Sequence, residues 1–197
     1  MRNYIGIDPG LDGGIAILPN DGTAIELIKT PVIGGRDYDI QEMKKILREF
    51  NPFFVVIENQ ISMPGQGLTS TLQTGKGFGI WLGLLAALEV PHQVVSARQW
   101  QIQIYTGISS KLETKEKSVI AAKRLFPSAD FRKSDRARVA NDGLTDAACI
   151  AEYARRLHQR SFSASTGVPH SPSEVNADIC IRCGRYIPTD ELGCVKD

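Results

Sequence analysis

The sequence predicts an α/β fold with one mixed sheet, and three observations carry this prediction. The first third alternates apolar stretches with clusters of Gly, Asn and Asp, which is typical of antiparallel hairpins. Amphipathic segments then alternate with short apolar ones, the order expected of a sheet covered by helices. The 197 residues, 42% hydrophobic and 23% charged, suffice for one globular domain of about 150 residues and an appendage.

Turn residues delimit the expected strands. Residues 3–8 (NYIGID) and 14–18 (GIAIL) flank the turn Pro-Gly-Leu-Asp-Gly, and a second turn, Pro-Asn-Asp-Gly, leads into 23–29. These three segments are predicted to form antiparallel strands. Residues 53–58 (FFVVIE) are almost continuously apolar, as in a strand buried on both faces, and 92–96 form another short strand.

Helices are expected where apolar residues recur every three or four positions. This spacing predicts helices over 39–50, 114–126 and 142–158. Residues 59–74 are polar and rich in Gly, Ser and Thr, so we expect a long loop, and long loops in compact domains are usually functional.

Residues 75–88 are helical in pattern in spite of four glycines, and this helix is apolar almost all round. Such a helix is buried on two sides. It is either a central core helix or a helix that packs on the sheet with one face and on a twofold partner with the other. The small glycines would allow a partner to approach closely.

The net charge of +1 hides an uneven distribution. Residues 1–97 carry a balance of −3, residues 98–160 a balance of +6 and residues 161–197 a balance of −2. The basic middle segment indicates either a polyanionic partner or solvated helix faces.

No run of 18 apolar residues exists, and the start of the chain lacks the features of a signal peptide. We therefore expect no contact with a membrane and a cytoplasmic or nucleoid-associated protein, with an organellar or viral origin left open.

The composition changes after a main domain of residues 1–160. Residues 161–177, rich in Ser and Pro, are expected to form a flexible linker, and 178–197 a short C-terminal tail. The tail contains a Cys-x-x-Cys pair and a third thiol ten residues later, which indicates either part of a structural Zn²⁺ knuckle or free thiols. Its candidate ligands are Cys180, Cys183, Cys194 and Asp197, with His170 in the linker as the other candidate for the fourth position.

Four carboxylates have the placement of a metal site. Asp8 and Glu58 end buried strands, where open α/β sheets carry their sites, and Asp142 and Asp146 share one helix face. Oxygen donors without His or Cys suit Mg²⁺ or Mn²⁺. Taken singly, Asp142 could cap its helix, Asp8 could be a turn residue, and Glu58 could pair with an arginine.

Four motifs carry a resemblance that spans residues 3–158. In order they are IGIDPGLDGGIAIL, VVIENQ, GKGFGIWLGLLAAL with the following VPHQVVSARQW, and NDGLTDAACIAEYARR. Together they resemble the RuvC-type Holliday-junction resolvases of the RNase H-like superfamily. The closest pattern is that of the plastid-type branch, which shares the Gly-rich helix with Phe78 and Trp81.

The chain departs from this branch at several positions. Ser96 stands where the branch has Pro, Gln101 where it has Lys, and Leu144 where it has Arg. Residues 139–141 (VAN) stand where the branch has Lys just before its acidic pair. The departures concern phosphate contacts and leave the acidic set complete.

The resemblance implies an RNase H-like fold, with a five-stranded mixed sheet flanked by helices. It implies an endonuclease that cuts four-way DNA junctions, with two Mg²⁺ or Mn²⁺ ions held by Asp8, Glu58, Asp142 and Asp146. A symmetric junction needs two cuts, so a homodimer with two sites is expected.

Candidate DNA contacts lie on the loop, the Gly-rich helix and the basic middle segment. Gln60, Met63 and Gln66 on the loop would probe the junction centre. The candidates for phosphate contact are Lys76, Lys111, Lys115, Lys117, Arg132, Lys133, Arg136 and Arg138.

Three other functions stay open at this point. An RNase H-like nuclease for flaps, RNA–DNA hybrids or branched DNA in general would use the same carboxylates. An ATP-binding domain of the sugar-kinase and actin type also opens with a strand and an Asp-Gly hairpin, but needs about twice the length and a second phosphate loop. The complete acidic set argues against a DNA-binding module without catalysis.

Overall fold

The computed structural model describes residues 2–22, 24–60, 67–163, 175–176 and 179–180. The chain divides into two compact units, Met1–Ala154 and Arg155–Asp197. The first unit holds the sheet and the expected catalytic residues.

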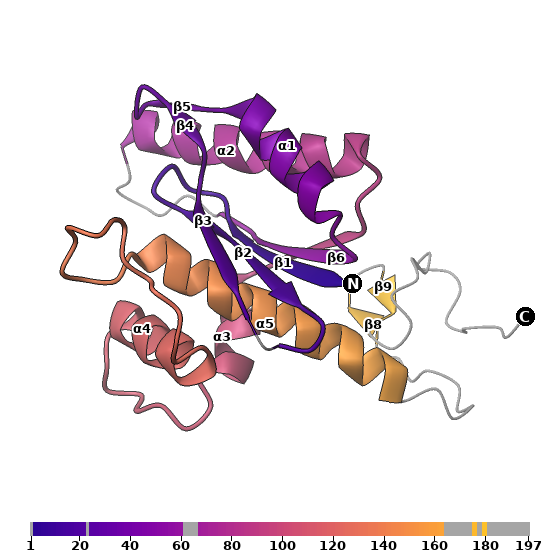
Figure 1. Ribbon diagram of the computed structural model, residues 1–197, viewed down its shortest axis with the longest axis vertical. Coiled ribbons are helices and arrows are strands. Elements are labelled where there is room, and N and C mark those ends of the chain that lie inside the picture. Colours follow the sequence, from indigo (N-terminus) through magenta and orange to yellow (C-terminus); the bar gives the residue numbers. More distant parts are fainter. Residues whose placement is uncertain (1, 23, 61–66, 164–174, 177–178, 181–197) are drawn as a thin grey trace, which may run out of the picture. The chain divides into compact units, whose positions relative to one another are not determined.

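The first unit is built on one five-stranded mixed sheet (Figure 1). Its strands are β1 (Asn3–Asp8), β2 (Gly14–Pro19), β3 (Glu26–Lys29), β6 (Phe54–Glu58) and β7 (His92–Val95). The strand order is β3-β2-β1-β6-β7, with β1, β2 and β3 antiparallel and β1, β6 and β7 parallel. The prediction of a five-stranded mixed sheet is confirmed. The strand expected over 23–29 forms only its last four residues, Glu26–Lys29.

Helices cover both faces of this sheet. In Figure 1, α1 and α2 lie on one side and α5 lies across the other, beside α3 and α4. The bounds are α1 (Ile40–Phe50), α2 (Leu68–Ala87), α3 (Ala97–Ile104), α4 (Thr114–Leu125) and α5 (Asp142–Ser163). A Cβ on Gly6 would lie 2.2 Å from the backbone nitrogen of Ala151, so β1 and α5 are in backbone contact.

Polar side chains fix where the helices begin. Asp39 accepts a hydrogen bond from the backbone of Glu42 at 3.0 Å and caps α1. Asn141 caps α5 in the same way, accepting from the backbone of Leu144 at 3.0 Å. Asp142 is therefore the first residue of α5 and is not its cap.

The core lies between the sheet and the helices. Ile5 and Ile7 of β1 and Val55 and Ile57 of β6 are fully buried, and Trp81 of α2 packs in the same cluster. The almost continuous apolar run of β6 is explained by helices on both faces.

The long loop expected over 59–74 is partly wrong, because α2 begins at Leu68. Seven residues assigned to the loop are helical, in spite of their polar composition. A tertiary contact accounts for this, since the hydroxyl of Tyr38 donates to the carbonyl oxygen of Gln73 at 3.2 Å. The intrinsic helix propensity of single residues influences the extent of a helix less than tertiary contacts of this kind.

A short hairpin that the sequence analysis did not identify positions Tyr38. Its strands are β4 (Val32–Ile33) and β5 (Asp37–Tyr38), joined by Gly34 and Gly35, which adopt φ of 61° and 70°. Residues other than glycine rarely adopt this conformation.

In the second unit, β8 (Val175–Asn176) pairs with β9 (Ile179–Cys180), and α5 extends three residues into the expected linker. His170, Cys183, Cys194 and Asp197 lie outside the described residues, so the zinc site and the domain boundaries stay predictions. None of the described helices is both long and apolar enough to cross a membrane.

Candidate active site

Asp8 and Glu58 lie at the same edge of the sheet. The parallel pairing of β1 and β6 places Ile7 opposite Ile57, so the next residue on each strand is one of these acids. Both strands end there, as expected for a site outside the carboxyl ends of parallel strands.

Two glycines bring the start of α5 to this edge. A Cβ on Gly143 would lie 2.4 Å from the carbonyl oxygen of Asp12, and one on Gly14 would lie 2.8 Å from the carbonyl oxygen of Gly143. Side chains at these positions would push the helix away from the turn after Asp8. The close approach brings Asp142 and Asp146 into the electrostatic field of Asp8.

Burial and mutual repulsion disfavour the charged forms of three acids. Burial raises the pKa of Asp8 to about 7, and the charges of Asp146 and Asp142 add to the shift. Burial, with the charges of Asp8 and Asp146, raises the pKa of Glu58 to about 8. The pKa of Asp146 rises to about 6, chiefly through burial. The three acids form one coupled group on three different elements.

Each acid of α5 and β1 also has a protein partner. The side-chain amide of Gln60 donates to Oδ1 of Asp8 at 3.0 Å, as does the backbone nitrogen of Gly10 at 3.3 Å. The hydroxyl of Ser118 on α4 donates to Oδ1 of Asp146. Lys115 forms an ion pair with Asp142, with 2.7 Å between Nζ and Oδ2.

No three His, Cys, Asp or Glu side chains in the described parts of the chain are arranged so that they could hold a metal ion as they stand. The four carboxylates lie at the same edge of the sheet, but their oxygen atoms do not converge on one position. Their chemistry fits a hard divalent cation, because they offer only oxygen donors. Among the described residues, moreover, no lysine or arginine forms an ion pair with Asp8 or Glu58.

The expected DNA contacts separate into two groups. Three of them touch the site or its turn, namely Gln60 at Asp8, Lys115 at Asp142, and Lys133, whose Nζ lies 3.9 Å from Asp12. The others among the described residues do not contact the acids of the site. Lys76 forms an ion pair with Asp37, Arg132 forms one with Asp130, and Lys117 donates to the carbonyl oxygen of Ser110. The remaining three are exposed, namely Lys111, Arg136 and Arg138. Met63 and Gln66 lie outside the described residues.

The sequence did not indicate the buried polar residues that contact the acids. Ser118 is buried, and its hydroxyl contacts both Asp146 and, at 3.1 Å, the hydroxyl of Thr145. Trp100 is a fully buried core residue. Its indole nitrogen and the hydroxyl of Tyr105 are also buried, and the indole lies near the carboxylate of Glu58.

The rings of Trp100 and Tyr105 meet edge to face, with centroids 5.4 Å apart. Both residues belong to α3 and its C-terminal end, whereas Ser118 joins α4 to Asp146 of α5, a contact that no local sequence pattern marks. Cys149 is fully buried, and burial raises the pKa of its thiol.

Known proteins resemble this chain in sequence and in fold. No protein-family model matches the chain. A protein of Gluconobacter oxydans (strain 621H), named crossover junction endodeoxyribonuclease RuvC, is 29% identical over 164 residues, which cover 78% of this chain and 92% of that protein.

Three solved structures share the fold. Thermus thermophilus RuvC in complex with a Holliday junction substrate aligns with a TM-score of 0.54 and 18% identity, over 77% of this chain and 90% of that one. T. thermophilus RuvC in a second structure gives 0.52 and 21%, over 76% and 91%. The yeast mitochondrial Holliday junction resolvase Ydc2 gives 0.53 and 14%, over 79% and 78%.

Proposed function

We propose that the chain is a RuvC-type Holliday-junction resolvase, as its similarity to the Gluconobacter oxydans protein indicates, and that Asp8, Glu58, Asp142 and Asp146 form its catalytic site. The protein is an endonuclease that cuts four-way DNA junctions. The observation that supports this site is the electrostatic coupling of three partly buried carboxylates from β1, β6 and α5 at one edge of the sheet.

These four carboxylates would hold Mg²⁺ or Mn²⁺, with two ions per site. Divalent ions bound there would activate the attacking water and stabilise the charge on the leaving oxygen. The protein's own contribution is to orient the ligands. The side-chain amide of Gln60 and the backbone nitrogen of Gly10 donate to Oδ1 of Asp8, and the hydroxyl of Ser118 donates to Oδ1 of Asp146. Such supporting contacts fix the direction in which a ligand presents its oxygen atoms.

Phosphate contact would begin with the basic residues nearest the acids. Lys115 is 80% exposed on its side chain and Lys133 is 58% exposed, so both can leave their acidic partners for a phosphate. Arg136 and Arg138 lie on the same basic segment and are exposed. Contacts of this kind make junction binding sensitive to salt.

A homodimer would use the outer side of α2. Trp81 and Leu85 are buried on the side of α2 that faces the sheet, whereas the opposite side is exposed. The helix is therefore not enclosed in the core on all sides. On the outer side, Leu68 and Leu72 are 85% and 70% exposed, and Cβ atoms on Gly75, Gly79 and Gly83 would meet no atom within 4 Å. An apolar side of this kind suits a twofold partner, which would supply the second active site for the second cut.

Two further expectations become proposals. The tail would hold one structural Zn²⁺ through Cys180, Cys183, Cys194 and Asp197, to be measured as metal content of full-length protein purified without chelator. The protein would act in the compartment that contains recombining DNA, in the cytoplasm or at the nucleoid.

The test uses a synthetic four-way junction and a linear duplex of matched sequence, each with Mg²⁺. We expect paired symmetric nicks in the junction and none in the duplex. Asp8→Asn, Glu58→Gln and Asp146→Asn should abolish cleavage and leave junction binding intact or tighter, because the carboxylates also repel phosphate. Asp142→Asn should have a milder effect.

Lys45→Ala changes an exposed residue distant from the acids in the sequence and serves as the control. Cleavage of flaps, hybrids or duplex at the same rate would favour the alternative of a nuclease with other specificity. A carboxylate variant with a normal rate would remove that residue from the site.

A further inference from the structure

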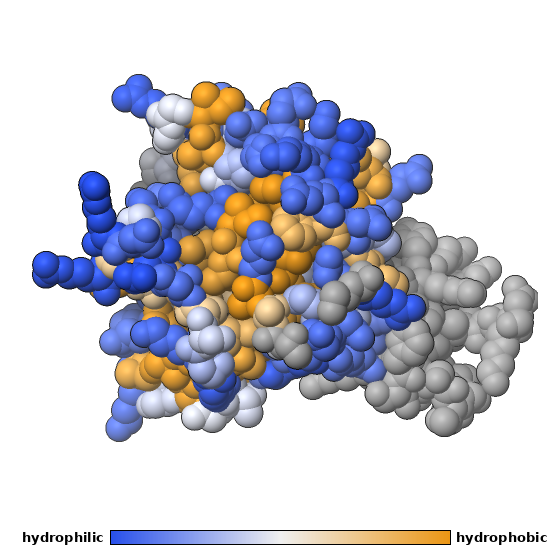
Figure 2. Space-filling model, viewed as in Figure 1, coloured by the Kyte–Doolittle hydropathy of each residue, from blue (hydrophilic) through white to orange (hydrophobic). Residues whose placement is uncertain are grey.

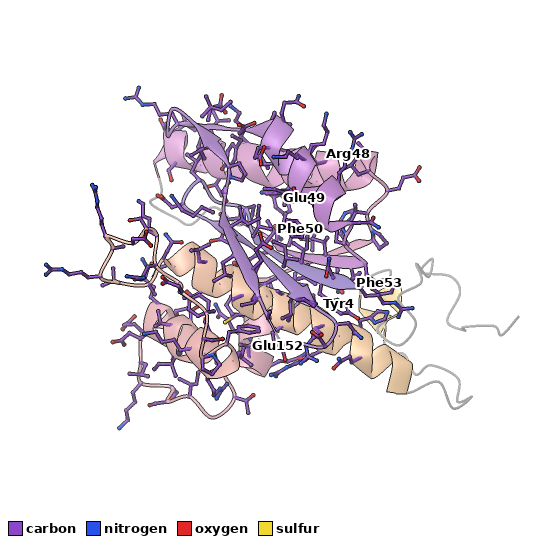
Figure 3. All side chains as sticks on the ribbon, viewed as in Figure 1. Tyr4, Arg48, Glu49, Phe50, Phe53 and Glu152 are labelled. Carbon is purple, nitrogen blue, oxygen red and sulfur yellow. The ribbon has the colours of Figure 1, made fainter. Side chains whose placement is uncertain are left out.

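A groove lies between β3 and α1, outside the acidic site. It encloses about 490 Å³ and has an apolar floor formed by Ile28 of β3 and by Ile46 and Phe50 of α1. Figure 2 shows an apolar area near the middle of the face that carries β3, with hydrophilic residues around it. In Figure 3, Phe50 is labelled at the end of α1 that faces the strands.

The strand beside this groove has a free edge. β3 is the outermost strand of the sheet and pairs only with β2 among the described residues. The backbone nitrogen of Thr30 donates to the carbonyl of Gly13 on the β2 side at 3.2 Å. Because peptide groups alternate in direction along an antiparallel strand, those of Leu27 and Lys29 point away from β2. An edge of this kind is a template for another strand.

The side chains alternate in the same way and place the groove on one face of that edge. Glu26, Ile28 and Thr30 share the face toward α1, and all three line the groove. Thr30 is 2% exposed, and its hydroxyl is buried without a hydrogen-bond partner in the described part of the chain. A strand added beside β3 would direct alternate side chains into the groove and bring polar backbone near this hydroxyl.

Acidic residues stand at both ends of the groove. The backbone nitrogen of Asp39 donates to the carbonyl of Pro31 at 2.9 Å, so the start of α1 lies beside the end of β3. This antiparallel arrangement places Glu42 at the Thr30 end of the groove and Glu49 at the opposite end, with Glu26. Lys29 is the only basic residue of the lining, and the alternation directs its side chain to the other face of the sheet. The groove therefore repels a phosphate backbone and attracts a basic peptide.

We propose that this groove binds an extended segment of a partner protein, which adds a sixth strand beside β3. The segment has apolar side chains in its middle, which cover Ile28, Ile46 and Phe50, and basic residues at both ends, which face the glutamates. Recognition of this type takes affinity from main-chain hydrogen bonds and specificity from alternate side chains.

The test uses a fluorescein-labelled octapeptide with two lysines at each end and Val-Thr-Val-Thr between them. A peptide with glutamate in place of lysine tests the charge, and one with Gly-Ser-Gly-Ser in the middle tests the apolar contact. Binding to the full-length protein is measured by fluorescence anisotropy. Amide hydrogen exchange is measured in parallel, and we expect the peptide to slow exchange at Leu27 and Lys29 at least tenfold.

Two kinds of variant separate the proposed contacts. Leu27→Pro removes an outward amide and should abolish binding while keeping the hydrogen bonds to β2. Glu26→Lys combined with Glu49→Lys leaves the backbone edge intact and should weaken binding at least tenfold. Asp135→Lys, an equal change of charge per site on an exposed residue distant in the sequence, should leave it unchanged.

Three results would overturn the proposal. They are absence of peptide binding at millimolar concentration, equal binding of the acidic peptide, and unchanged binding by the Glu26→Lys and Glu49→Lys double variant. The double variant keeps the test decisive if Leu27→Pro does not fold. Junction cleavage by the double variant should match that of the unmodified protein, because the groove is separate from the acids.

Discussion

At the scale of single residues, the acids of the site are costly to the fold. Asp8, Glu58 and Asp146 are withdrawn from water and repel one another, which raises the pKa of each. A protein that needed these positions only for stability would fill them with apolar groups. Their presence, with Gln60 donating to Asp8 and Ser118 donating to Asp146, fits the cation site proposed above.

Metal-free protein should lose stability as the pH rises from about 4.5 to about 8. Ordinary pKa values are 3.8 for Asp and 4.5 for Glu, whereas the folded protein holds Asp146, Asp8 and Glu58 at about 6, 7 and 8. Between these limits the folded state binds more protons than the unfolded state, so the free energy of unfolding falls with rising pH.

Urea denaturation in the presence of a chelator measures this dependence. The double variant Asp8→Asn and Glu58→Gln should show a flatter profile, and Mg²⁺ should restore the stability of the unmodified protein at pH 8.5. A free energy of unfolding that rises over this range would contradict the assignment.

Ser118→Ala should weaken binding of Mn²⁺ by about 10- to 100-fold, the range typical of a lost supporting contact to a metal ligand. The hydroxyl is the donor to Asp146, and its loss leaves that carboxylate without a fixed orientation. Calorimetric titration with Mn²⁺ gives the affinity independently of cleavage. Ser118→Thr keeps the hydroxyl and should restore much of it. An unchanged affinity in Ser118→Ala would show that the contact does not orient Asp146.

At the scale of elements, α2 shows how tertiary contacts determine the extent of a helix. Gly77 is the point of closest approach, since a Cβ there would lie 2.2 Å from the hydroxyl oxygen of Tyr38 and 2.6 Å from the carbonyl oxygen of Pro9. Tyr38 also donates to Pro9 at 3.4 Å, within the turn that follows Asp8. The start of α2, the hairpin that carries Tyr38 and the turn beside the acids are therefore one connected structure.

Gly77→Ala should destabilise the protein by about 1–3 kcal/mol, the usual cost of inserting a methyl group into a filled space. Gly79→Ala, two residues along, meets no atom within 4 Å and should not destabilise, because Ala is the better helix former. Chemical denaturation of both variants gives the comparison. Equal losses of stability in the two variants would show that the contact with Tyr38 is not the cause.

At the scale of the whole molecule, the described part of one 21.6 kDa chain carries one proposed acidic site, whereas the proposed resolution of a junction needs two cuts. The outer side of α2 and the groove beside β3 differ in chemistry. The outer side of α2 is apolar and carries small residues, which suits close contact between helices. The groove is apolar with acidic residues at its ends, which suits a basic strand. The two surfaces can therefore serve different partners.

Leu72→Glu should convert a dimer into a monomer, because it places a charge on the exposed apolar side of α2. Light scattering should give twice 21.6 kDa for the unmodified protein and 21.6 kDa for the variant. Ile102→Glu changes another exposed apolar residue, on α3, and should leave the dimer intact. A monomer for the unmodified protein, both free and bound to a junction, would exclude the proposed dimer.

The sequence by itself predicted the mixed sheet, the positions of its five strands along the chain and the acids that end two of them. Period-two and period-3.6 patterns are local, and an acid at the end of a buried strand is visible in the chain as written. Its resemblance to a known family added the junction as substrate.

Only the tertiary structure decided the start of α2 at Leu68, the role of Tyr38 and the placement of Ser118 beneath Asp146. It alone also revealed that β3 ends the sheet beside an acidic groove. These features depend on contacts between residues 28 to 35 positions apart or on which strand lies at the edge of the sheet, and neither leaves a periodic signal in the sequence.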